Sequence, residues 1–319
     1  MNKIPVHIIT GFLGSGKTTF LNHLIRSNAE SRVMVIENEV GQVNIDSTLI
    51  NPSASGIKEM TAGCICCSLN EELYDFLYEL THIRTTFDVL IIETTGIADP
   101  GPVLETFRTG AFMLANYQVQ NVICVTDIQN ISKSLSVSDE ARRQIFYADT
   151  ILLNKIDLAT KEEIANITSV ILDIHPGVQI YHGQKNDYPR FDINEPLISR
   201  SDKMAKLESS FDTLSEKSHH GMITFSLRYD QPFDIKHLKH TLMILLSTHK
   251  EEIFRIKAII DVADVDHRVI LQSVYQTFST EEGSKWTQKV KRRSIFVFIG
   301  RNVDKTGIEK LVGQCMVQD

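Results

Sequence analysis

Short apolar runs alternate with segments of helical periodicity along the first part of the chain. Each run predicts a buried strand, and the runs lie at 6–9, 32–36, 87–92, 119–125, 150–153 and 178–181. Between them, apolar residues recur every three or four positions, which predicts helices, for example over 20–25 and 69–80. Strands that alternate with helices are typical of a mostly parallel sheet with helices on both faces.

The pattern changes in the middle of the chain. Polar and charged side chains crowd residues 184–220, which predicts a linker with one short helix over 203–214. Alternating positions then predict a half-buried strand over 222–227. Further strands are predicted at 253–262, 269–278 and 294–300, and helices at 234–247 and 305–313. We therefore predict an α/β domain over 1–183 and a small α+β C-terminal domain over 221–319.

Polar clusters follow the apolar runs of the first domain. They lie at 37–39, 93–96, 127 and 154–157, each directly after a predicted strand. The carboxyl ends of parallel strands meet at one edge of a sheet, and ligands bind in the crevice beyond that edge. We therefore expect the functional site at this edge.

Composition and charge narrow the function classes. The chain has 319 residues, 42% of them hydrophobic, and a formal net charge of −7. This balance gives no electrostatic support to nucleic-acid binding. No apolar run approaches the length of about 20 residues that crosses a bilayer, and no signal peptide is recognised. We expect a cytoplasmic protein that binds neither nucleic acid nor membrane.

The first predicted strand leads into a glycine-rich turn. Residues 11–18, Gly-Phe-Leu-Gly-Ser-Gly-Lys-Thr, fit the pattern G-x-x-x-x-G-K-[ST], and a predicted helix follows. The backbone N–H groups of such a P-loop cradle phosphate oxygens at the positive end of the helix. Lys17 would reach the β- and γ-phosphates, and the Thr18 hydroxyl would bind Mg²⁺. The residues expected to contact a nucleoside triphosphate are Gly11, Phe12, Leu13, Gly14, Ser15, Gly16, Lys17, Thr18 and Thr19.

The element Asn154-Lys155-Ile156-Asp157 identifies the base as guanine. The Asp157 carboxylate can accept hydrogen bonds from N1 and N2 of guanine, and adenine offers no such pair of donors. Asn154 would bind the O6/N7 edge, and the aliphatic stem of Lys155 would pack on the ring. A structural alternative is that Asp157 caps a helix over 158–172, and both roles can hold together.

A second phosphate-side element ends the strand at 87–92. We expect Glu93 to hold Mg²⁺ through water or to orient the attacking water, and the Gly96 amide to sense the γ-phosphate. Asp46 is a weaker candidate for switch or Mg²⁺ duty, and a solvated loop carboxylate is its alternative. No arginine is placed as a transition-state finger, so we expect slow intrinsic GTP hydrolysis that awaits a partner or a metal.

Three cysteines lie within four positions, at Cys64, Cys66 and Cys67. Thiolates at this spacing can bind one soft or borderline ion such as Zn²⁺, but three do not complete a tetrahedral site. Glu37 and Glu39, after the second strand, could supply oxygen. Buried free thiols and a redox pair are the alternatives.

Together these motifs resemble those of the CobW-type metal-chaperone GTPases, and most closely the stand-alone YjiA-like branch. The resemblance rests on ITGFLGSGKTT, the Glu-Asn-Glu element, GCICC, FDVLIIETTGIADPGPV and ILLNKIDL, and it extends over nearly the whole chain. It implies a P-loop GTPase domain with a small C-terminal domain. The implied activity is GTP-coupled delivery of a divalent ion, Zn²⁺ or Co²⁺, to a client protein.

The resemblance assigns the transition-metal ligands to Glu37, Cys64, Cys66 and Cys67. Gln42 stands where many members have an acid, so one oxygen ligand is missing, and the histidine-rich segment of some members is reduced to His219-His220. The implied partner is a metal-dependent client protein, and a homodimer stays an open alternative. A GTP-dependent protein–protein switch with redox or structural cysteines is the main competing function.

Overall fold

The computed structural model describes two compact units. One unit comprises residues 1–169 and 178–197, and the other comprises residues 170–177 and 198–319. The described residues are 3–37, 43–45, 60–62, 69–185, 187–194, 217–219, 222–249, 252–274, 277–287 and 291–317. The helix expected over 203–214 lies outside them. Among the described residues, no helix is both long and apolar enough to cross a membrane.

The first unit is built on a six-stranded sheet in which every neighbouring pair is parallel. The strand order is β2-β5-β1-β6-β7-β8. The strands are β1 (Ile4–Thr10), β2 (Val33–Glu37), β5 (Val89–Glu93), β6 (Tyr117–Asp127), β7 (Thr150–Asn154) and β8 (Gln179–His182). The predicted α/β fold with a mostly parallel sheet is confirmed.

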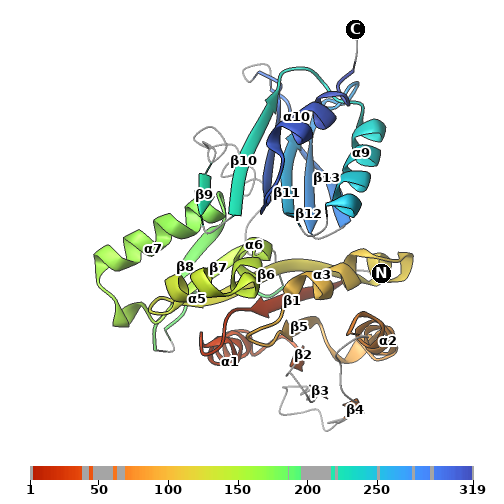
Figure 1. The fold of residues 1–319 in the computed structure, drawn as a ribbon. Coiled ribbons are helices and arrows are strands. Elements are labelled where there is room, and N and C mark those ends of the chain that lie inside the picture. Colours follow the sequence, from red (N-terminus) through yellow and green to blue (C-terminus); the bar gives the residue numbers. More distant parts are fainter. Residues whose placement is uncertain are drawn as a thin grey trace. The chain divides into compact units, whose positions relative to one another are not determined.

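Helices cover both faces of this sheet (Figure 1). They are α1 (Lys17–Ser27), α2 (Leu69–His82), α3 (Pro100–Arg108), α4 (Ala111–Asn116), α5 (Ile131–Val137) and α6 (Asp139–Tyr147). Helix α7 (Lys161–Ile174) begins in this unit and ends in the second. Helix α1 buries Phe20, Leu21, Leu24 and Ile25 against the sheet, which are the four residues that the periodicity places on one face. Helices α3 and α6 contact β6.

Residues 187–194 belong to the packing of the first unit, although the sequence analysis places them in a linker. Tyr188, Phe191 and Ile193 are buried in the same core cluster as α1, and Phe20 packs edge-on against both aromatic rings. His7 Nε2 lies 2.8 Å from the Ile193 carbonyl oxygen. Three buried apolar residues, together with hydrogen bonds such as that from Asn28 to the Phe191 carbonyl, therefore attach this polar stretch to the first unit.

A short two-stranded ladder follows β2. Strands β3 (Val43–Ile45) and β4 (Met60–Ala62) pair antiparallel, with Val43 opposite Ala62. Strand β3 also contacts β2. Two segments of the long excursion between β2 and α2 are thus paired with each other, and one of them contacts β2.

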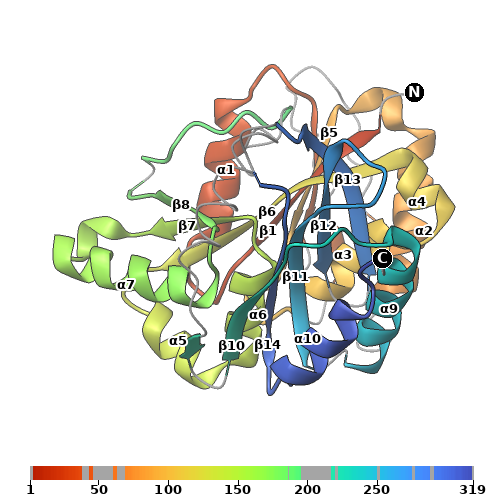
Figure 2. The same ribbon diagram turned by 90° about the horizontal axis from the view of Figure 1, so that it is seen from above.

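The second unit contains a six-stranded antiparallel sheet in the order β13-β12-β11-β14-β10-β9. Its strands are β9 (Lys217–His219), β10 (Met222–Tyr229), β11 (Ile253–Ile260), β12 (His267–Val274), β13 (Thr277–Lys285) and β14 (Ser294–Arg301). Helices α9 (Ile235–Thr248) and α10 (Lys305–Gly313) bury an apolar core against it, and Figure 2 shows the two helices next to each other from above. The small α+β C-terminal domain is confirmed.

Two details of this unit differ from the sequence prediction. The single strand predicted over 269–278 is wrong, because this range contains the end of β12 and the start of β13, which pair antiparallel. Strand β9 lies within the predicted linker and pairs with β10 at the edge of the sheet.

Candidate nucleotide site

The P-loop connects β1 to α1 at the carboxyl edge of the first sheet. Lys17 Nζ donates to the Gly11 carbonyl at 3.0 Å and lies 3.4 Å from that of Phe12. Burial lowers the pKa of Lys17, and the nearby Glu93 carboxylate opposes this shift only in part. The Lys17 ammonium group thus contacts the P-loop backbone, and a bound phosphate group would replace the carbonyls of Gly11 and Phe12 as its partner.

Gly16 allows the P-loop to approach the base-recognition element. Its φ of +98° lies in the left-handed region, and a Cβ added there would lie 2.4 Å from Asn154 Nδ2. Asn154 Nδ2 in turn donates to the Ser15 carbonyl at 2.8 Å. One N–H of the Asn154 amide therefore binds the P-loop. The rest of the amide is available for the predicted contact with the guanine edge.

Thr18 and Glu93 meet beside the P-loop. The Thr18 hydroxyl donates to Glu93 Oε1 at 2.9 Å, and Glu93 is 8% exposed. Glu93 is opposite Ile9 in the β1–β5 register, so the carboxyl ends of two neighbouring strands fix its position. A hydroxyl and a carboxylate are the hard oxygen donors that Mg²⁺ prefers, and these two fit the ion.

The carboxyl end of β7 carries the guanine element. Asp157 lies in a short 3₁₀ helix, Ile156–Leu158, with its side chain 16% exposed. Its Oδ2 lies 3.2 Å from Nζ of Lys185, a residue with an 80% exposed side chain that follows β8. The carboxylate is thus within reach of solvent, and its present partner is an easily displaced surface ammonium.

Asp127 was not predicted as a site residue, although its position at a strand end was noted. Lys155 Nζ lies 2.8 Å from both Asp127 Oδ2 and the Gly14 carbonyl oxygen, and so bridges β6 and the P-loop. Burial raises the pKa of Asp127, but hydrogen bonds from Lys155, Asn130 and Gln129 outweigh it, and the pKa lies below its ordinary value. Lys155 therefore ties the base end of the site to the phosphate end.

The helix-capping alternative for Asp157 is wrong. Helix α7 begins at Lys161, not at 158. The Thr160 hydroxyl accepts from the Glu163 N–H at 3.2 Å, and Glu163 Oε2 accepts from the Thr160 N–H at 2.7 Å. This reciprocal capping box supplies the cap, which leaves the Asp157 carboxylate for a ligand.

Gly96 lies in the turn that follows β5, next to the P-loop. It is buried, and a Cβ added there would lie 2.6 Å from Leu13 Cδ2. The side-chain amide of Gln144, on α6, donates to the Gly96 carbonyl at 3.2 Å. No motif marks Gln144, so sequence reasoning missed this contact.

The predicted metal ligands are described only in part. Asp46, Cys64, Cys66 and Cys67 lie outside the described residues. Glu37 is the last residue of β2, and its backbone is opposite Glu93 in the parallel register of β2 and β5. Within the described part of the chain, no group of three or more His, Cys, Asp and Glu side chains is arranged to hold a metal ion.

Known proteins resemble both units. The CobW/HypB/UreG nucleotide-binding domain matches residues 5–182, and the cobalamin synthesis protein cobW C-terminal domain matches residues 222–316. The zinc chaperone YjiA of Escherichia coli is 32% identical over 305 residues, covering 94% of this chain and 95% of that protein. Zinc-regulated GTPase metalloprotein activator 1 of Dictyostelium discoideum is 32% identical over 230 residues, covering 60% of this chain and 48% of that protein. The crystal structure of Zn(II)-bound YjiA GTPase from E. coli matches with a TM-score of 0.70 and 26% identity, covering 99% of this chain and 100% of that chain.

Proposed function

Because the chain belongs to the CobW/HypB/UreG family and carries the cobW C-terminal domain, we propose that it is a GTP-hydrolysing metallochaperone. It would bind a divalent transition metal, with zinc as the first choice and cobalt as the second, and transfer it to a client protein. The relatives named above are a zinc chaperone and a zinc-regulated GTPase metalloprotein activator. A protein–protein switch with redox or structural cysteines has no support among them.

One observation carries this proposal: the nucleotide elements and the start of the metal-binding excursion share one sheet edge. The backbones of Glu37 and Glu93 lie opposite each other on adjacent strands, and neighbouring strands are about 4.8 Å apart. Glu93 contacts Thr18 of the P-loop. A movement of β5 relative to β2 on GTP binding would therefore act directly on the segment that leads to the cysteines.

The nucleotide half of the proposed cycle uses the residues of the site as follows. Lys17 would exchange the carbonyls of Gly11 and Phe12 for the β- and γ-phosphates, and Asp157 would exchange Lys185 for the guanine N–H groups. Mg²⁺, held by Thr18 and Glu93, would supply positive charge to the phosphate oxygens. We expect hydrolysis to be slow in the absence of a partner, because we assign no arginine to the transition state.

The metal half rests on Cys64, Cys66 and Cys67, with Glu37 as an oxygen ligand. The β3–β4 ladder supports this set, because Val43 and Ala62 lie opposite each other. Val43 comes six residues after Glu37, and Ala62 comes two residues before Cys64. A site with three thiolates and a carboxylate suits a borderline ion such as Zn²⁺.

The client is a metal-dependent protein, and dimerisation of the chain is a further part of the proposal. A second copy would provide a symmetric way to enclose the nucleotide, and its test is the mass of the protein in solution with GTP and with GDP. We also infer a cytoplasmic location, because a transfer site made of thiolates has to stay reduced.

The experiment that tests the proposal is a zinc titration in the presence of a competing chromophoric chelator. The parent chain is compared with a variant carrying Cys64→Ala, Cys66→Ala and Cys67→Ala. His237 and His240, exposed on α9, can bind zinc nonspecifically, so a variant with His237→Ala and His240→Ala is the matched control. We expect the cysteine variant to lose one tight equivalent of zinc and the histidine variant to keep it.

A second arm measures transfer. Zinc-loaded protein is mixed with a metal-free acceptor, and release is followed after addition of GTP, GDP or a non-hydrolysable GTP analogue. We expect GTP to accelerate transfer beyond GDP. Unchanged zinc stoichiometry in the cysteine variant, or transfer that ignores the nucleotide, would contradict the proposed function.

A further inference from the structure

The turn after β5 is held at its start by the P-loop strand. The Thr94 hydroxyl donates to Thr10 Oγ1 at 3.0 Å, and the Thr94 N–H donates to the Ile9 carbonyl at 2.9 Å. The Ala98 N–H then donates to the Thr95 carbonyl at 3.2 Å, which closes a four-residue turn with Gly96 inside it. The expected γ-phosphate sensor is thus one peptide group within a defined turn.

Helix α6 fixes the outer side of this turn. Gln144 Nε2 donates to the Gly96 carbonyl at 3.2 Å and to the Ala98 carbonyl at 3.0 Å. The Gln144 side chain is buried, with the residue 1% exposed. Arg143 Nη1 lies 2.7 Å from Asp99 Oδ2, and Asp99 Oδ1 caps α3 by accepting from a backbone N–H. Two consecutive residues of α6 therefore hold both the turn and the residue that follows it.

Helix α6 is itself immobilised, so Gln144 has a fixed base. The Ser138 hydroxyl caps the helix by accepting from the Ala141 N–H at 3.1 Å. Arg142, 9% exposed, donates to the Leu135 carbonyl at 2.6 Å and thereby ties α6 to the end of α5. Ile145, directly after Gln144, is fully buried. The glutamine amide is presented by a helix that packing and capping hold in place.

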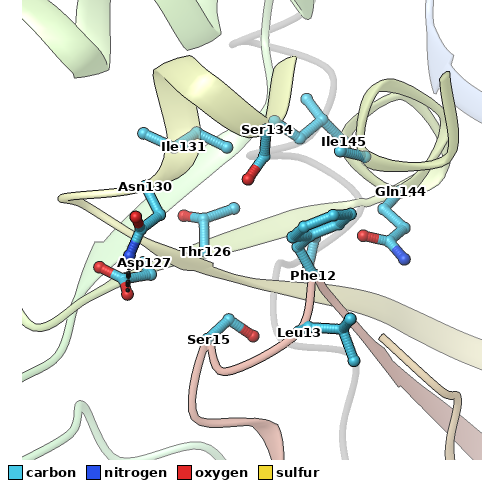
Figure 3. A pocket seen from close by; sticks show the side chains of 12 residues that line it. Phe12, Leu13, Ser15, Thr126, Asp127, Asn130, Ile131, Ser134, Gln144 and Ile145 are labelled. Carbon is cyan, nitrogen blue, oxygen red and sulfur yellow. Dashed lines mark hydrogen bonds between the residues drawn. The ribbon is translucent and has the colours of Figure 1, made fainter. Parts of the chain in front are cut away.

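The opposite side of the turn meets the P-loop. Gly96 packs against Leu13 so closely that a Cβ at Gly96 would clash with it. Figure 3 shows Gln144 reaching from α6 toward Phe12, with Leu13 and Ser15 on the same loop. These side chains line a cavity with room for about one water molecule, and Ser15 Oγ is buried there without a hydrogen-bond partner among the described residues. The turn is therefore held between α6 and the P-loop.

We propose that Gln144 is a positioning residue for γ-phosphate recognition. It touches no nucleotide. By binding the carbonyls of Gly96 and Ala98 it fixes the peptide groups between residues 96 and 97 and between residues 98 and 99. The Gly96 N–H belongs to the peptide group between Thr95 and Gly96, whose carbonyl accepts from the Ala98 N–H, so Gln144 orients the Gly96 N–H through the turn. This inference rests on the proposed GTPase function and assigns to α6 the task of making the site distinguish GTP from GDP.

The test is the variant Gln144→Met, which keeps the volume of the side chain but has no donor. Affinities for GDP and for a non-hydrolysable GTP analogue are measured with Mg²⁺, together with kcat and KM for GTP. Loss of two neutral hydrogen bonds should lower affinity for the GTP analogue and kcat/KM by about tenfold. GDP has no γ-phosphate, so its affinity should stay within about twofold of the parent value.

Asn121→Leu is the matched control, because Asn121 is also 1% exposed and its amide donates to Thr150 in the same unit. It should lower thermal stability without changing the ratio of GTP to GDP affinity. If Gln144→Met does not fold, Gln144→Asn is measured instead. It keeps a buried amide but shortens the side chain by one methylene, which moves the donor away from the carbonyls of Gly96 and Ala98, and a loss in the same direction is expected.

Equal losses for GDP and the GTP analogue, or an unchanged or increased affinity for the analogue, would overturn the role of Gln144. Failure of the proposed function itself would appear differently, as a parent protein that neither hydrolyses GTP nor links it to metal.

Discussion

Replacing Asp157 with asparagine tests how the site recognises its base. The substitution keeps the shape of the side chain and exchanges one acceptor oxygen for a donor. In the structure the carboxylate pairs with Lys185, whose side chain is 80% exposed, and such surface pairs contribute little to stability. The variant should therefore fold normally, and changes in binding should report on the nucleotide alone.

The expected magnitude follows from the hydrogen bonds to guanine. Asp157 would accept from N1 and N2, and each bond to a charged group is worth about 1.5–3 kcal/mol. Asparagine can still accept one bond but sets its NH₂ group against the other donor. We expect a loss of about 3 kcal/mol, which is roughly a hundredfold in GTP affinity. Xanthine carries an oxygen in place of N2, so XTP should bind the variant more tightly than it binds the parent.

The assay is displacement of a fluorescent guanine nucleotide by GTP and by XTP, with Mg²⁺ present. Asp187→Asn is the control, because Asp187 is an exposed carboxylate in the loop that carries Lys185. GTP affinity of Asp157→Asn within about threefold of the parent would refute guanine recognition by this residue, and so would a failure of XTP to gain affinity.

Three further predictions concern the phosphate end and its link to the base end. Burial lowers the pKa of Lys17 below 10.5, and bound phosphates favour the charged form of this lysine. GTP affinity should therefore be highest below the lowered pKa and should fall as pH rises through it. A binding profile from pH 7 to about 10 measures this dependence. Asp127→Asn should weaken GDP and GTP binding alike, by about tenfold in equilibrium titrations, because Lys155 loses a charged partner. The pKa of Asp127 lies below 3.8, so the ion pair between Asp127 and Lys155 should persist above that pH. It should weaken only as acid protonates the carboxyl group. Glu93→Gln should lower kcat for GTP by about a hundredfold and raise the Mg²⁺ concentration needed for half-maximal turnover. Glu105→Gln, which changes a partly buried carboxyl group of α3, should change neither.

The apolar pattern predicts the first sheet well because most positions of its inner strands are buried. Runs such as Val89–Glu93 have no exposed position, so they stand out from the helical segments around them. Residues at the carboxyl ends of the strands then converge through topology alone. The convergence of Glu93, Asp127 and Asn154 was therefore predictable, and the structure agrees with it.

The sequence pattern predicts the ends of β12, β13 and α7 incorrectly. Apolar residues occur throughout the range 269–278, at 269–271, 274–275 and 278, so the pattern does not separate β12 from β13. The Asp157 carboxylate predicts a helix over 158–172, whereas the capping box of Thr160 and Glu163 starts α7 at Lys161. Both errors concern element ends, where hydrogen bonds of single residues decide the outcome.

Contacts between elements distant in sequence were beyond prediction. Gln144 is one polar residue on an amphipathic helix, and only the fold brings it to Gly96. Tyr188 and Phe191 lie in a polar stretch and become core residues because α1 offers them an apolar face. The direction of Lys155 likewise depends on Asp127, a residue 28 positions away in sequence.

The central claim is that GTP and the transition metal bind to one coupled system. Its most direct test is the affinity of the parent protein for a non-hydrolysable GTP analogue, with Mg²⁺, measured with and without saturating Zn²⁺. The account predicts that zinc changes this affinity by the same factor by which the analogue changes zinc affinity. It also predicts that the change disappears in the variant with Cys64→Ala, Cys66→Ala and Cys67→Ala. Equal affinity for the analogue with and without Zn²⁺ would contradict it.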